Sequence, residues 1–279
     1  MEDEIPFKIS KRKKILRWVI PVVFIYCGLG LVLFYFQEKF MFHPEPLARD
    51  YVFPFNRPFK EVFIPMNPWD TLHLVQFFTP DSTPSKGVVL YFHGNRDNVI
   101  RYEKYVDNFT KQGYEVWMPD YPGYGKSTGT LTERLIYSEA EAVYKLARTH
   151  FGEDSIVIYG KSLGTGPAAF IASEFKCHRL ILETPYFSFP SLFNIYAPIY
   201  PTQRMSRFKF PVGKYLEKVK APITIFHGTE DKVVFYTNAS KLKTKLKPGD
   251  EFITIEEGKH NNLNDFPVYQ EKLDSLLKQ

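Results

Sequence analysis

The sequence has little cysteine: only Cys27 and Cys177 occur in 279 residues. Two cysteines cannot build a disulfide framework or an all-cysteine metal site, so small folds that depend on either are excluded. A strong excess of one charge is also lacking, because 36 basic residues face 31 acidic ones. Residues 1–17 hold six basic and three acidic residues, which is +3 of the chain's +5. The rest of the chain is nearly neutral, so we expect no nucleic-acid partner.

No spacing of histidine and glutamate typical of a zinc hydrolase occurs either. We therefore expect no metal ion and no cofactor. What is abundant is apolar and aromatic surface, since 44% of the residues are hydrophobic and 26 are Phe and 18 Tyr. This composition belongs to a folded protein and excludes a disordered or low-complexity chain.

One long uncharged run covers residues 18–36, which is 19 residues, with Trp18 and Tyr35 near its ends. A helix needs about 20 residues to cross a hydrocarbon core, so the run predicts a transmembrane anchor. A cleaved signal peptide is the alternative, but its apolar region is shorter and precedes small residues. Residues 1–17 form a basic tail, and the positive-inside rule predicts a cytoplasmic N-terminus. The remaining residues then lie on the non-cytoplasmic side of the membrane.

Residues 37–60 are rich in proline and aromatics, and we expect an extended tether that packs on the following domain. Residues 61–279 alternate apolar strand-like runs with helix-like ones. Several runs, such as VVLYF and IVIY, are continuously apolar, as strands covered on both faces are. The expected strands are Glu61–Pro65, Leu72–Phe78, Val88–Phe92, Tyr114–Met118, Ile156–Tyr159, Leu180–Leu182, Ile223–Phe226 and Phe252–Ile255.

The predicted helices are Leu131–Thr149, Gly164–Glu174, Asn238–Leu246 and Pro267–Leu277. This alternation predicts an α/β fold with a mainly parallel central sheet and helices on both faces. The first two strands are close enough in sequence to form an antiparallel hairpin. Residues 185–215 interrupt the alternation with nine aromatics, and we interpret them as a small cap over the carboxyl edge of the sheet. Two hypotheses stay open: the aromatics contact substrate, or they form only the cap's own core.

A G-x-S-x-G motif, Gly160-Lys161-Ser162-Leu163-Gly164, lies between a predicted strand and a predicted helix. The turn between them must be sharp to lift the serine hydroxyl above the sheet, and the glycines leave room for it. This context predicts that Ser162 is a nucleophile. A serine hydroxyl reacts poorly near neutral pH unless a base is hydrogen-bonded to it.

Seven histidines could supply that base. His260 lies in a loop between the last strand and the last helix, at the carboxyl edge where Ser162 also emerges, and we predict that it is the base. An acid must then fix the imidazole tautomer. Asp231 follows the strand ITIF at the same edge and is the predicted acid, with Glu183 as the second choice and Glu230 and Asp120 behind it.

The tetrahedral intermediate of acyl transfer needs backbone N–H groups aimed at its oxyanion. Leu163, directly after the nucleophile, supplies one. The second is expected from Asn95, in the loop after the third strand, where Gly94 permits the turn. His93 in the same loop is interpreted as a structural residue that braces it.

These motifs resemble those of α/β-hydrolases, and more narrowly those of the membrane-anchored Bem46 and ABHD12/13/17-like group, often described as serine aminopeptidase-like. The chain order Ser162, Asp231, His260 is the order expected for that fold. The resemblance covers about residues 38–275 and implies the fold and the catalytic machinery. It is carried by Phe42-His43-Pro44, Tyr91–Asn95, Pro119–Ser127, Gly160–Gly164, His227–Asp231 and Gly258–Asn261.

Relatives in this group include esterases, thioesterases acting on lipid-modified proteins, and lipid hydrolases. The first hypothesis is therefore a membrane-anchored serine hydrolase of ester or thioester bonds, with a small-molecule acyl or lipid-derived substrate. The alternatives are a serine peptidase or amidase acting on short peptides, an acyltransferase that uses the same acyl-enzyme, and a non-catalytic binding module. The sequence leaves the natural substrate and the oligomeric state open.

Overall fold

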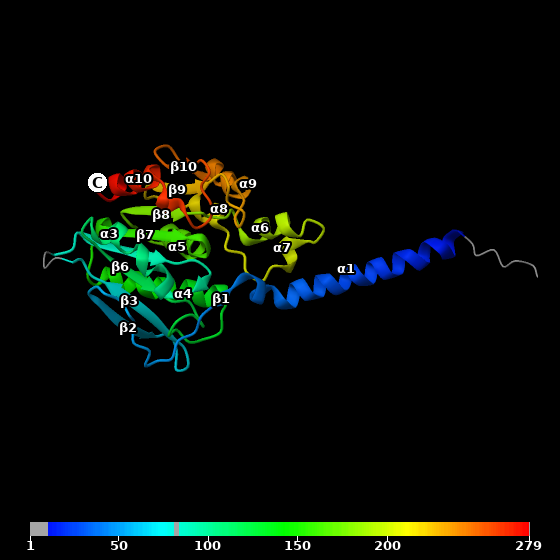
Figure 1. Cartoon of the computed structure of the whole chain (residues 1–279), viewed down its shortest axis with the longest axis horizontal. Helices are drawn as coiled ribbons and strands as arrows, with labels where there is room; N and C mark the ends of the chain where they lie inside the picture. Colours follow the sequence, from blue (N-terminus) through cyan, green and yellow to red (C-terminus); the bar gives the residue numbers. More distant parts are fainter. Residues whose placement is uncertain (1–10, 81–83, 279) are drawn as a thin grey trace, which may run out of the picture. The chain divides into compact units, whose positions relative to one another are not determined.

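A computed structural model describes residues 11–80 and 84–278 in two compact units, residues 1–41 and 42–279. The first unit contains the helix α1 (Lys11–Met41) (Figure 1). From Leu16 to Met41 this helix is apolar and long enough to cross a membrane, which makes it a candidate anchor. Residues 1–10 of the predicted basic tail lie outside the described residues.

The helix α1 continues beyond the predicted anchor of residues 18–36 and ends at Met41. The predicted extended tether is therefore wrong for residues 37–41, which are helical. The side-chain amide of Gln37 donates to the carbonyl of Phe34 at 2.7 Å inside this last stretch. Residues 37–41 contain no glycine or proline, so nothing in the backbone stops the helix before His43-Pro44.

An eight-stranded sheet forms the centre of the second unit, and every predicted strand is present in it. Its strands from β4 to β10 are parallel, whereas β3 runs antiparallel to both β2 and β6. The predicted antiparallel hairpin is β2–β3. In spatial order the strands are β10 (Glu251–Ile255), β9 (Ile223–Gly228), β8 (Arg179–Glu183), β7 (Ile156–Lys161), β4 (Gly87–Phe92), β6 (Tyr114–Pro119), β3 (Thr71–Phe77) and β2 (Phe59–Pro65).

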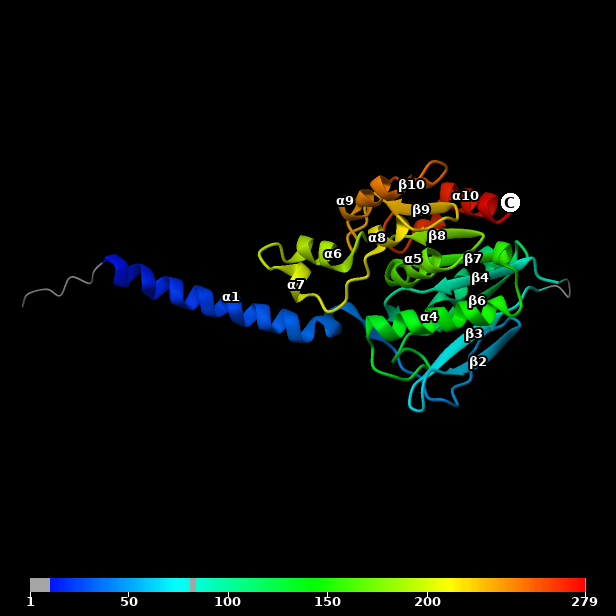
Figure 2. The same cartoon turned by 180° about the vertical axis from the view of Figure 1, so that it is seen from behind.

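Helices cover both faces of this sheet (Figures 1 and 2). One face carries α4 (Glu133–Arg148) and α5 (Thr165–Glu174). The other carries α3 (Asp107–Thr110) and α10 (Pro267–Lys278). The predicted helix Asn238–Leu246 is instead the short α9 (Tyr236–Ala239) followed by a 3₁₀-helix, Ser240–Lys245.

The core explains why the central strands read as continuous apolar runs. Every residue of β4, β7, β8 and β9 is buried. Alternate side chains such as Val89, Tyr91 and Tyr159 pack with Tyr269 and Leu273 of α10 in one cluster. Their neighbours in sequence face α4 and α5. The fold is thus an α/β sandwich of three layers.

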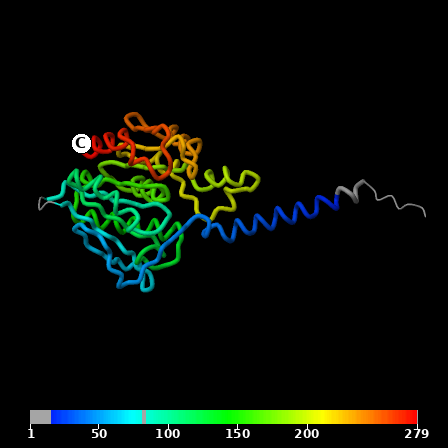
Figure 3. The backbone as a smooth tube through the Cα atoms, viewed as in Figure 1, coloured from blue at the N-terminus to red at the C-terminus, as the bar shows by residue number. Residues whose placement is uncertain are grey.

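The chain after α1 is attached to the domain by short strands. The strand β1 (His43–Pro44) pairs in parallel with β5 (Arg96–Asp97). Pro46 is bridged to Gly125, and the Leu47 N–H donates to the Gly125 carbonyl at 2.7 Å. In Figure 3 this segment runs along the domain until it reaches β2.

The insertion between β8 and β9 carries α6 (Phe189–Tyr196), α7 (Thr202–Met205) and α8 (Val212–Leu216). The helices α6 and α7 stand apart from the helical layers, whereas α8 packs against α5 (Figure 2). The insertion matches the residues of the predicted cap, 185–215, and follows the carboxyl end of β8.

Candidate active site

Ser162 directly follows β7 and opens a short 3₁₀-helix, Ser162–Gly164, that leads into α5. Its φ is +52°, in the left-handed region. A non-glycine residue in a sparsely populated backbone region costs about 1–3 kcal/mol, and such strain clusters at functional sites. The strained turn raises the serine side chain at the carboxyl edge of the sheet, as the G-x-S-x-G spacing predicts.

Gly164 allows this turn to lie against the end of β4. A Cβ on Gly164 would lie 1.9 Å from the carbonyl oxygen of Phe92, so no other residue fits there without a shift of the backbone. The close approach brings the segment after β4, with Asn95, beside the segment that contains Leu163. The two backbone N–H groups predicted to hold an oxyanion therefore belong to adjacent segments; that both are aimed at one substrate oxygen stays a prediction.

The structure brings the three predicted side chains together. The Oγ of Ser162 lies 2.9 Å from Nε2 of His260, and Nδ1 of the same ring lies 2.8 Å from Oδ2 of Asp231. Since the carboxylate can only accept a hydrogen bond, the proton sits on Nδ1. The unprotonated Nε2 can then accept the serine proton. This arrangement can activate a hydroxyl as a nucleophile.

Two loops at the carboxyl edge hold the acid and the base. Asp231 follows β9, and its Oδ1 accepts the backbone N–H groups of Val233 and Val234, each at 2.8 Å. This fixes the carboxylate so that Oδ2 faces the imidazole. His260 follows β10, whose loop lies very close to that of β9, because a Cβ on Gly228 would lie 2.1 Å from the carbonyl oxygen of Gly258.

Burial differs within the trio in a way that suits acid–base chemistry. Ser162 and His260 each keep 8% of their surface exposed, whereas Asp231 keeps 3% and its side chain none. The carboxylate is thus shielded from water, which strengthens its interaction with a positively charged imidazole.

Two other buried histidines at this edge have partners of their own. Nε2 of His227 lies 2.8 Å from the carbonyl oxygen of Val234. Burial lowers the pKa of His227, although the nearby charge of Asp231 opposes this. The ring of His93 bonds through Nδ1 to the Gly94 carbonyl at 2.7 Å and lies between the rings of Tyr102 and Tyr121. His93 therefore braces its loop, which is the role that the sequence predicts for it.

Asp120, one of the less favoured acids, lies behind that same loop. Its Oδ1 accepts the Val99 N–H at 2.9 Å and its Oδ2 lies 3.2 Å from Nδ1 of His73. Burial raises the pKa of Asp120, but the facing rings of His73 and His93 outweigh it, so the pKa is lowered overall. A charged Asp120 thus supports the loop that carries Asn95. Among the described residues, no group of three or more His, Cys, Asp or Glu side chains is arranged to hold a metal ion.

Glu183, the second choice for the acid, is engaged elsewhere. Its carboxylate accepts from Nζ of Lys161 and from the hydroxyl of Tyr159. The hydroxyl of Tyr269 adds a third contact at 3.3 Å. Glu183 is fully buried and Lys161 almost fully buried. The cluster therefore lies inside the domain, and one of its members, Lys161, directly precedes Ser162 in the chain. The structure places Asp231, and not Glu183, against His260.

Sequence reasoning did not find the pairing of Lys161 with Glu183. The two residues are register partners at the ends of the parallel strands β7 and β8. Opposite charges at the last positions of adjacent strands are a signal that could have found it, but only once the strand order and register are known.

Most aromatics of the predicted cap are buried, whereas contact of the others with a substrate stays a prediction. Five of the nine are buried, namely Tyr186, Phe189, Tyr200, Phe208 and Phe210. The Tyr186 hydroxyl donates to the Leu163 carbonyl at 3.0 Å, directly behind the nucleophile turn. The buried aromatics therefore belong to the core under the cap, whereas Tyr196 is 56% exposed.

Comparison with known proteins finds one family model and several curated relatives. The family model described as "Serine aminopeptidase, S33" matches residues 83–214. Alpha/beta hydrolase domain-containing protein 17C of Xenopus tropicalis is 29% identical over 204 residues, which are 72% of this chain and 64% of that protein. Protein 17B of Homo sapiens is 28% identical over 206 residues, 72% of this chain and 70% of the relative. The chain thus spans less than two thirds of the length of the first of these relatives.

Solved structures share the fold. An esterase of Pyrococcus furiosus superposes with a TM-score of 0.66 at 20% identity, over 85% of this chain and 97% of the esterase. The thioesterase domain from the curacin biosynthetic pathway superposes with a TM-score of 0.55 at 16% identity, over 80% of this chain and all of that domain. The chain has the α/β-hydrolase fold, and its sequence is similar to those of the ABHD17 proteins. Its expected fold class is confirmed.

In an α/β-hydrolase the catalytic side chains come from loops at the carboxyl ends of strands, in the chain order nucleophile, acid, base. In this chain the ends of β7, β9 and β10 are followed by the candidate residues Ser162, Asp231 and His260 in that order.

Proposed function

We propose that this α/β-hydrolase is a membrane-anchored serine hydrolase that cleaves carboxylic ester or thioester bonds through an acyl-enzyme. One observation carries the proposal: His260 bonds to Ser162 through one ring nitrogen and to Asp231 through the other, at 2.9 and 2.8 Å. A serine bonded to an imidazole that an acid orients is the arrangement needed for nucleophilic catalysis.

In the first half of the reaction, Ser162 Oγ attacks the acyl carbon while its proton passes to Nε2 of His260. Asp231 stabilises the imidazolium that forms. The N–H groups of Leu163 and Asn95 hold the negative oxygen of the tetrahedral intermediate. His260 then protonates the departing alcohol or thiol, and the acyl group remains bonded to Ser162.

In the second half, water takes the place of the leaving group. His260 accepts a proton from the water, whose oxygen attacks the acyl carbon. The second tetrahedral intermediate collapses, His260 returns the proton to Ser162 Oγ, and the carboxylic acid leaves. The same acyl-enzyme transferred to an alcohol would make the protein an acyltransferase, so the partition between water and alcohol is part of the proposal's test.

The substrate is proposed to be an acyl or lipid-derived ester or thioester. An anchored enzyme meets such molecules in the membrane, and the compared esterase and thioesterase domain share the fold. The second candidate is cleavage of short peptides or amides, which is favoured by the description of the family model that matches residues 83–214.

We further propose that α1 spans the membrane with its N-terminus in the cytoplasm and the hydrolase domain on the opposite side. The apolar stretch Leu16–Met41 is long enough for this. The basic residues before Trp18 and the single Lys39 near the other end supply the charge asymmetry that orients such a helix.

A fluorophosphonate probe tests the nucleophile directly, because it phosphonylates only an activated serine. The full-length protein should be labelled, whereas Ser162→Ala should not. Ser173→Ala, which removes a serine from the same helix that follows the nucleophile, should be labelled like the wild type. Labelling of Ser162→Ala at the wild-type rate would overturn the assignment.

A substrate panel separates the two candidate bond types. The panel compares p-nitrophenyl acyl esters, matched acyl thioesters and aminoacyl anilides. We expect turnover of esters and thioesters that falls about 10⁴-fold in Ser162→Ala and in His260→Ala, with folding intact. Turnover of the anilides alone would replace the first function by the second, and labelling without any turnover would indicate a binding module.

A further inference from the structure

A group of exposed apolar side chains borders the candidate active site. Ile195 and Tyr196 end α6, Ile199 lies in the turn that follows, and Val233 lies in the loop after β9. These four residues, here called the apolar rim, are 38%, 56%, 69% and 49% exposed. An exposed apolar cluster of this kind on a folded domain marks a surface that binds a partner or a membrane.

The apolar rim is connected to the acid of the candidate triad. The hydroxyl of Tyr196 donates to the carbonyl of Val233 at 2.8 Å, which joins α6 to the loop after β9. In the same loop, the N–H of Val233 donates to Oδ1 of Asp231 at 2.8 Å. Val233 of the rim therefore lies two residues from Asp231, in the loop that holds the candidate acid at the carboxyl edge of the sheet.

All charged residues of the cap segment are basic. Residues 185–215 contain four basic residues and no acidic one. Arg204 on α7 and Lys214 on α8 are exposed. Exposed apolar and aromatic side chains combined with exposed cations on one surface segment are typical of surfaces that lie at the interface of a bilayer with anionic lipids. A protein partner with an acidic face would complement the cations of the cap. It would not supply the apolar surface that the rim needs, whereas the acyl chains of a bilayer would.

The candidate anchor is connected directly to the unit that carries the cap. The last residue of α1 is Met41, and the next residue, Phe42, is buried in the second unit. The ring of Phe42 lies 4.7 Å from that of Phe208 and 6.4 Å from that of Phe189, both in the cap segment. Only one peptide bond therefore separates the candidate anchor from a residue packed in the cap.

We infer that the apolar rim docks on the bilayer that α1 spans, with phospholipids, including anionic ones, as its occupant. Docking there would let an acyl chain pass from the bilayer to Ser162 without crossing water. The docking itself is independent of the proposed function, whereas the delivery of an acyl chain rests on it. The two parts therefore need separate measurements.

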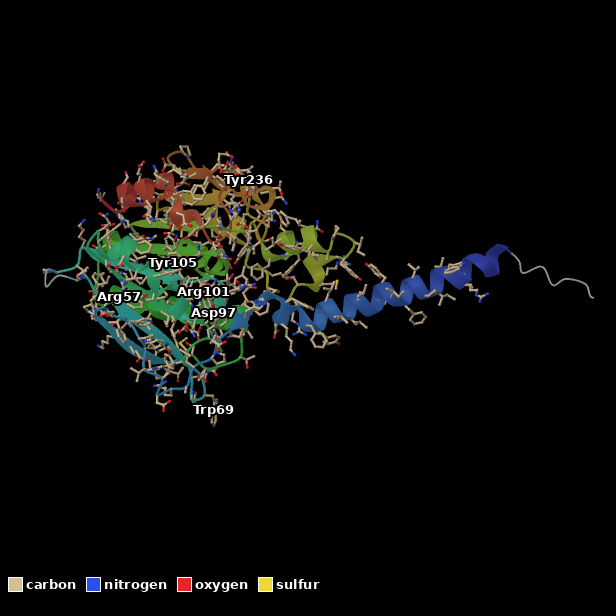
Figure 4. All side chains as sticks on the ribbon, in the orientation of Figure 1. Arg57, Trp69, Asp97, Arg101, Tyr105 and Tyr236 are labelled. Atoms are coloured by element: carbon tan, nitrogen blue, oxygen red, sulfur yellow. The ribbon has the colours of Figure 1, made fainter. Side chains whose placement is uncertain are left out.

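A depth measurement tests the docking. In a Cys27→Ser background, where Cys177 is buried, Ile199→Cys receives an environment-sensitive fluorophore, and Trp69→Cys serves as the matched control. Trp69 is 87% exposed and lies in the turn between β2 and β3, at the bottom of the domain in Figure 4 and away from α6 and α7. The full-length protein is placed in phosphatidylcholine vesicles that carry a shallow nitroxide quencher, with and without phosphatidylglycerol.

We expect the fluorophore at residue 199 to lose about half its emission or more, because a docked side chain lies at the level of the headgroups and upper acyl chains. The label at residue 69 should change little, and removal of phosphatidylglycerol or the change Arg204→Gln should weaken the quenching at residue 199. Equal emission at both positions, or quenching at residue 69 alone, would overturn the docking.

An activity ratio tests the delivery. Hydrolysis of a long-chain p-nitrophenyl ester embedded in the vesicles is divided by hydrolysis of p-nitrophenyl acetate in water. The double variant Ile195→Asp/Ile199→Asp should lower this ratio about tenfold, since a charged side chain is costly to place in the interface. Trp69→Asp, an equally drastic change of an exposed apolar residue, should keep the wild-type ratio.

The outcomes separate the two proposals. An unchanged ratio in the double variant overturns the delivery, although the serine hydrolase stands if Ser162→Ala is inactive on both esters. Activity of Ser162→Ala on both esters overturns the proposed function, although quenching at residue 199 would still support the docking. The rate of fluorophosphonate labelling shows that the double variant has kept its fold.

Discussion

Lys161 and Glu183 form an ion pair inside the protein, next to the serine proposed as nucleophile. Both are buried, and Glu183 also accepts from the hydroxyl of Tyr159. Taking two charges out of water is costly, and the interaction between them repays this only when the geometry is good and other hydrogen bonds satisfy the remaining atoms. Because Lys161 precedes Ser162 in the chain, the pair also holds the backbone of the strained turn in place.

Replacing one member of the pair should therefore lower the free energy of unfolding more than expected from replacing both. Lys161→Met leaves a buried carboxylate without its cation and should lower the free energy of unfolding by about 3–5 kcal/mol. In the double variant Lys161→Met/Glu183→Gln the loss should be smaller than the sum of the two single losses. Denaturant unfolding of the full-length protein, with the rate of fluorophosphonate labelling beside it, measures both effects.

An exposed ion pair supplies the control for this cycle. Lys245 and Glu217 have side chains that are 28% and 51% exposed. Breaking this pair with Lys245→Met should cost less than about 1 kcal/mol. Additive losses at Lys161 and Glu183 would show that the two charges do not depend on each other, contrary to our expectation.

Among individual residues, the three candidate catalytic side chains are easier to predict from the sequence than the contacts around them. Ser162, Asp231 and His260 each follow a strand, and parallel strands end at the same edge, so the order of elements suffices to place them together. The contact between Lys161 and Glu183 depends on the register of β7 with β8. Strand register follows from packing of the whole sheet, which a motif does not contain.

The helix α4 contains a buried carboxyl group that no partner explains. Glu139 is 2% exposed, and neither of its carboxylate oxygens has a hydrogen-bond partner among the described residues. Burial raises the pKa of Glu139 well above its ordinary value, and the charges of Asp70 and Asp120 add to this. The folded state therefore binds the proton more tightly than the unfolded chain does.

The sign of the pH effect follows from that difference. Between the ordinary pKa of Glu139 and its raised value in the folded state, the folded protein holds more protons than the unfolded one, so stability falls as pH rises, by up to about 1.4 kcal/mol per pH unit. Glu139→Gln cannot ionise and should be more stable than the wild type by about 1–3 kcal/mol at mildly alkaline pH. At pH values below the ordinary pKa the two proteins should converge.

Thermal or denaturant unfolding as a function of pH measures this prediction. Glu141→Gln is the matched control on the same helix, since Glu141 is partly exposed and pairs with Lys145 at 2.6 Å. Its effect should stay within about 0.5 kcal/mol. Parallel pH curves for the wild type and Glu139→Gln would contradict a buried, protonated carboxyl.

Long elements were predictable and short ones were not. The strands β4, β7 and β9 are apolar throughout because helices cover both faces of the sheet. Residues 99–110, in contrast, form two four-residue helices, α2 (Val99–Tyr102) and α3, joined by a 3₁₀ turn, and no helix was predicted there. Pieces this short carry no periodic pattern and are held by packing of residues such as Phe109 in the core.

The whole chain joins a candidate membrane anchor directly to a domain of the α/β-hydrolase fold, since the boundary between its two units lies between Met41 and Phe42. An apolar run and a charge bias can be recognised in a sequence. The point where the helix ends cannot, because residues 37–41 are polar enough for a loop and yet continue α1. The tether beyond it pairs with β5, a contact between residues far apart in the chain.

The proposed orientation depends on the charges at one end of α1. Residues 1–17 hold six cations and three acids, whereas only Lys39 lies close to the other end of the apolar run. Cytoplasmic flanks of transmembrane helices carry the excess of Lys and Arg. In sealed, right-side-out cells, added protease should therefore digest the hydrolase domain of the wild-type protein.

A charge reversal makes this expectation sharper. Neutral residues in place of Lys8, Lys11, Arg12, Lys13 and Lys14, together with new lysines in place of Gln37 and Glu38, should move the excess of cations to the domain side of α1. The domain should then be protected in sealed cells and digested only after the membrane is opened. A variant with the new lysines alone is the control, and should leave a mixture of the two orientations. Protection of the wild-type domain in sealed cells would show that features other than these charges orient the helix, and would put the hydrolase in the cytoplasm.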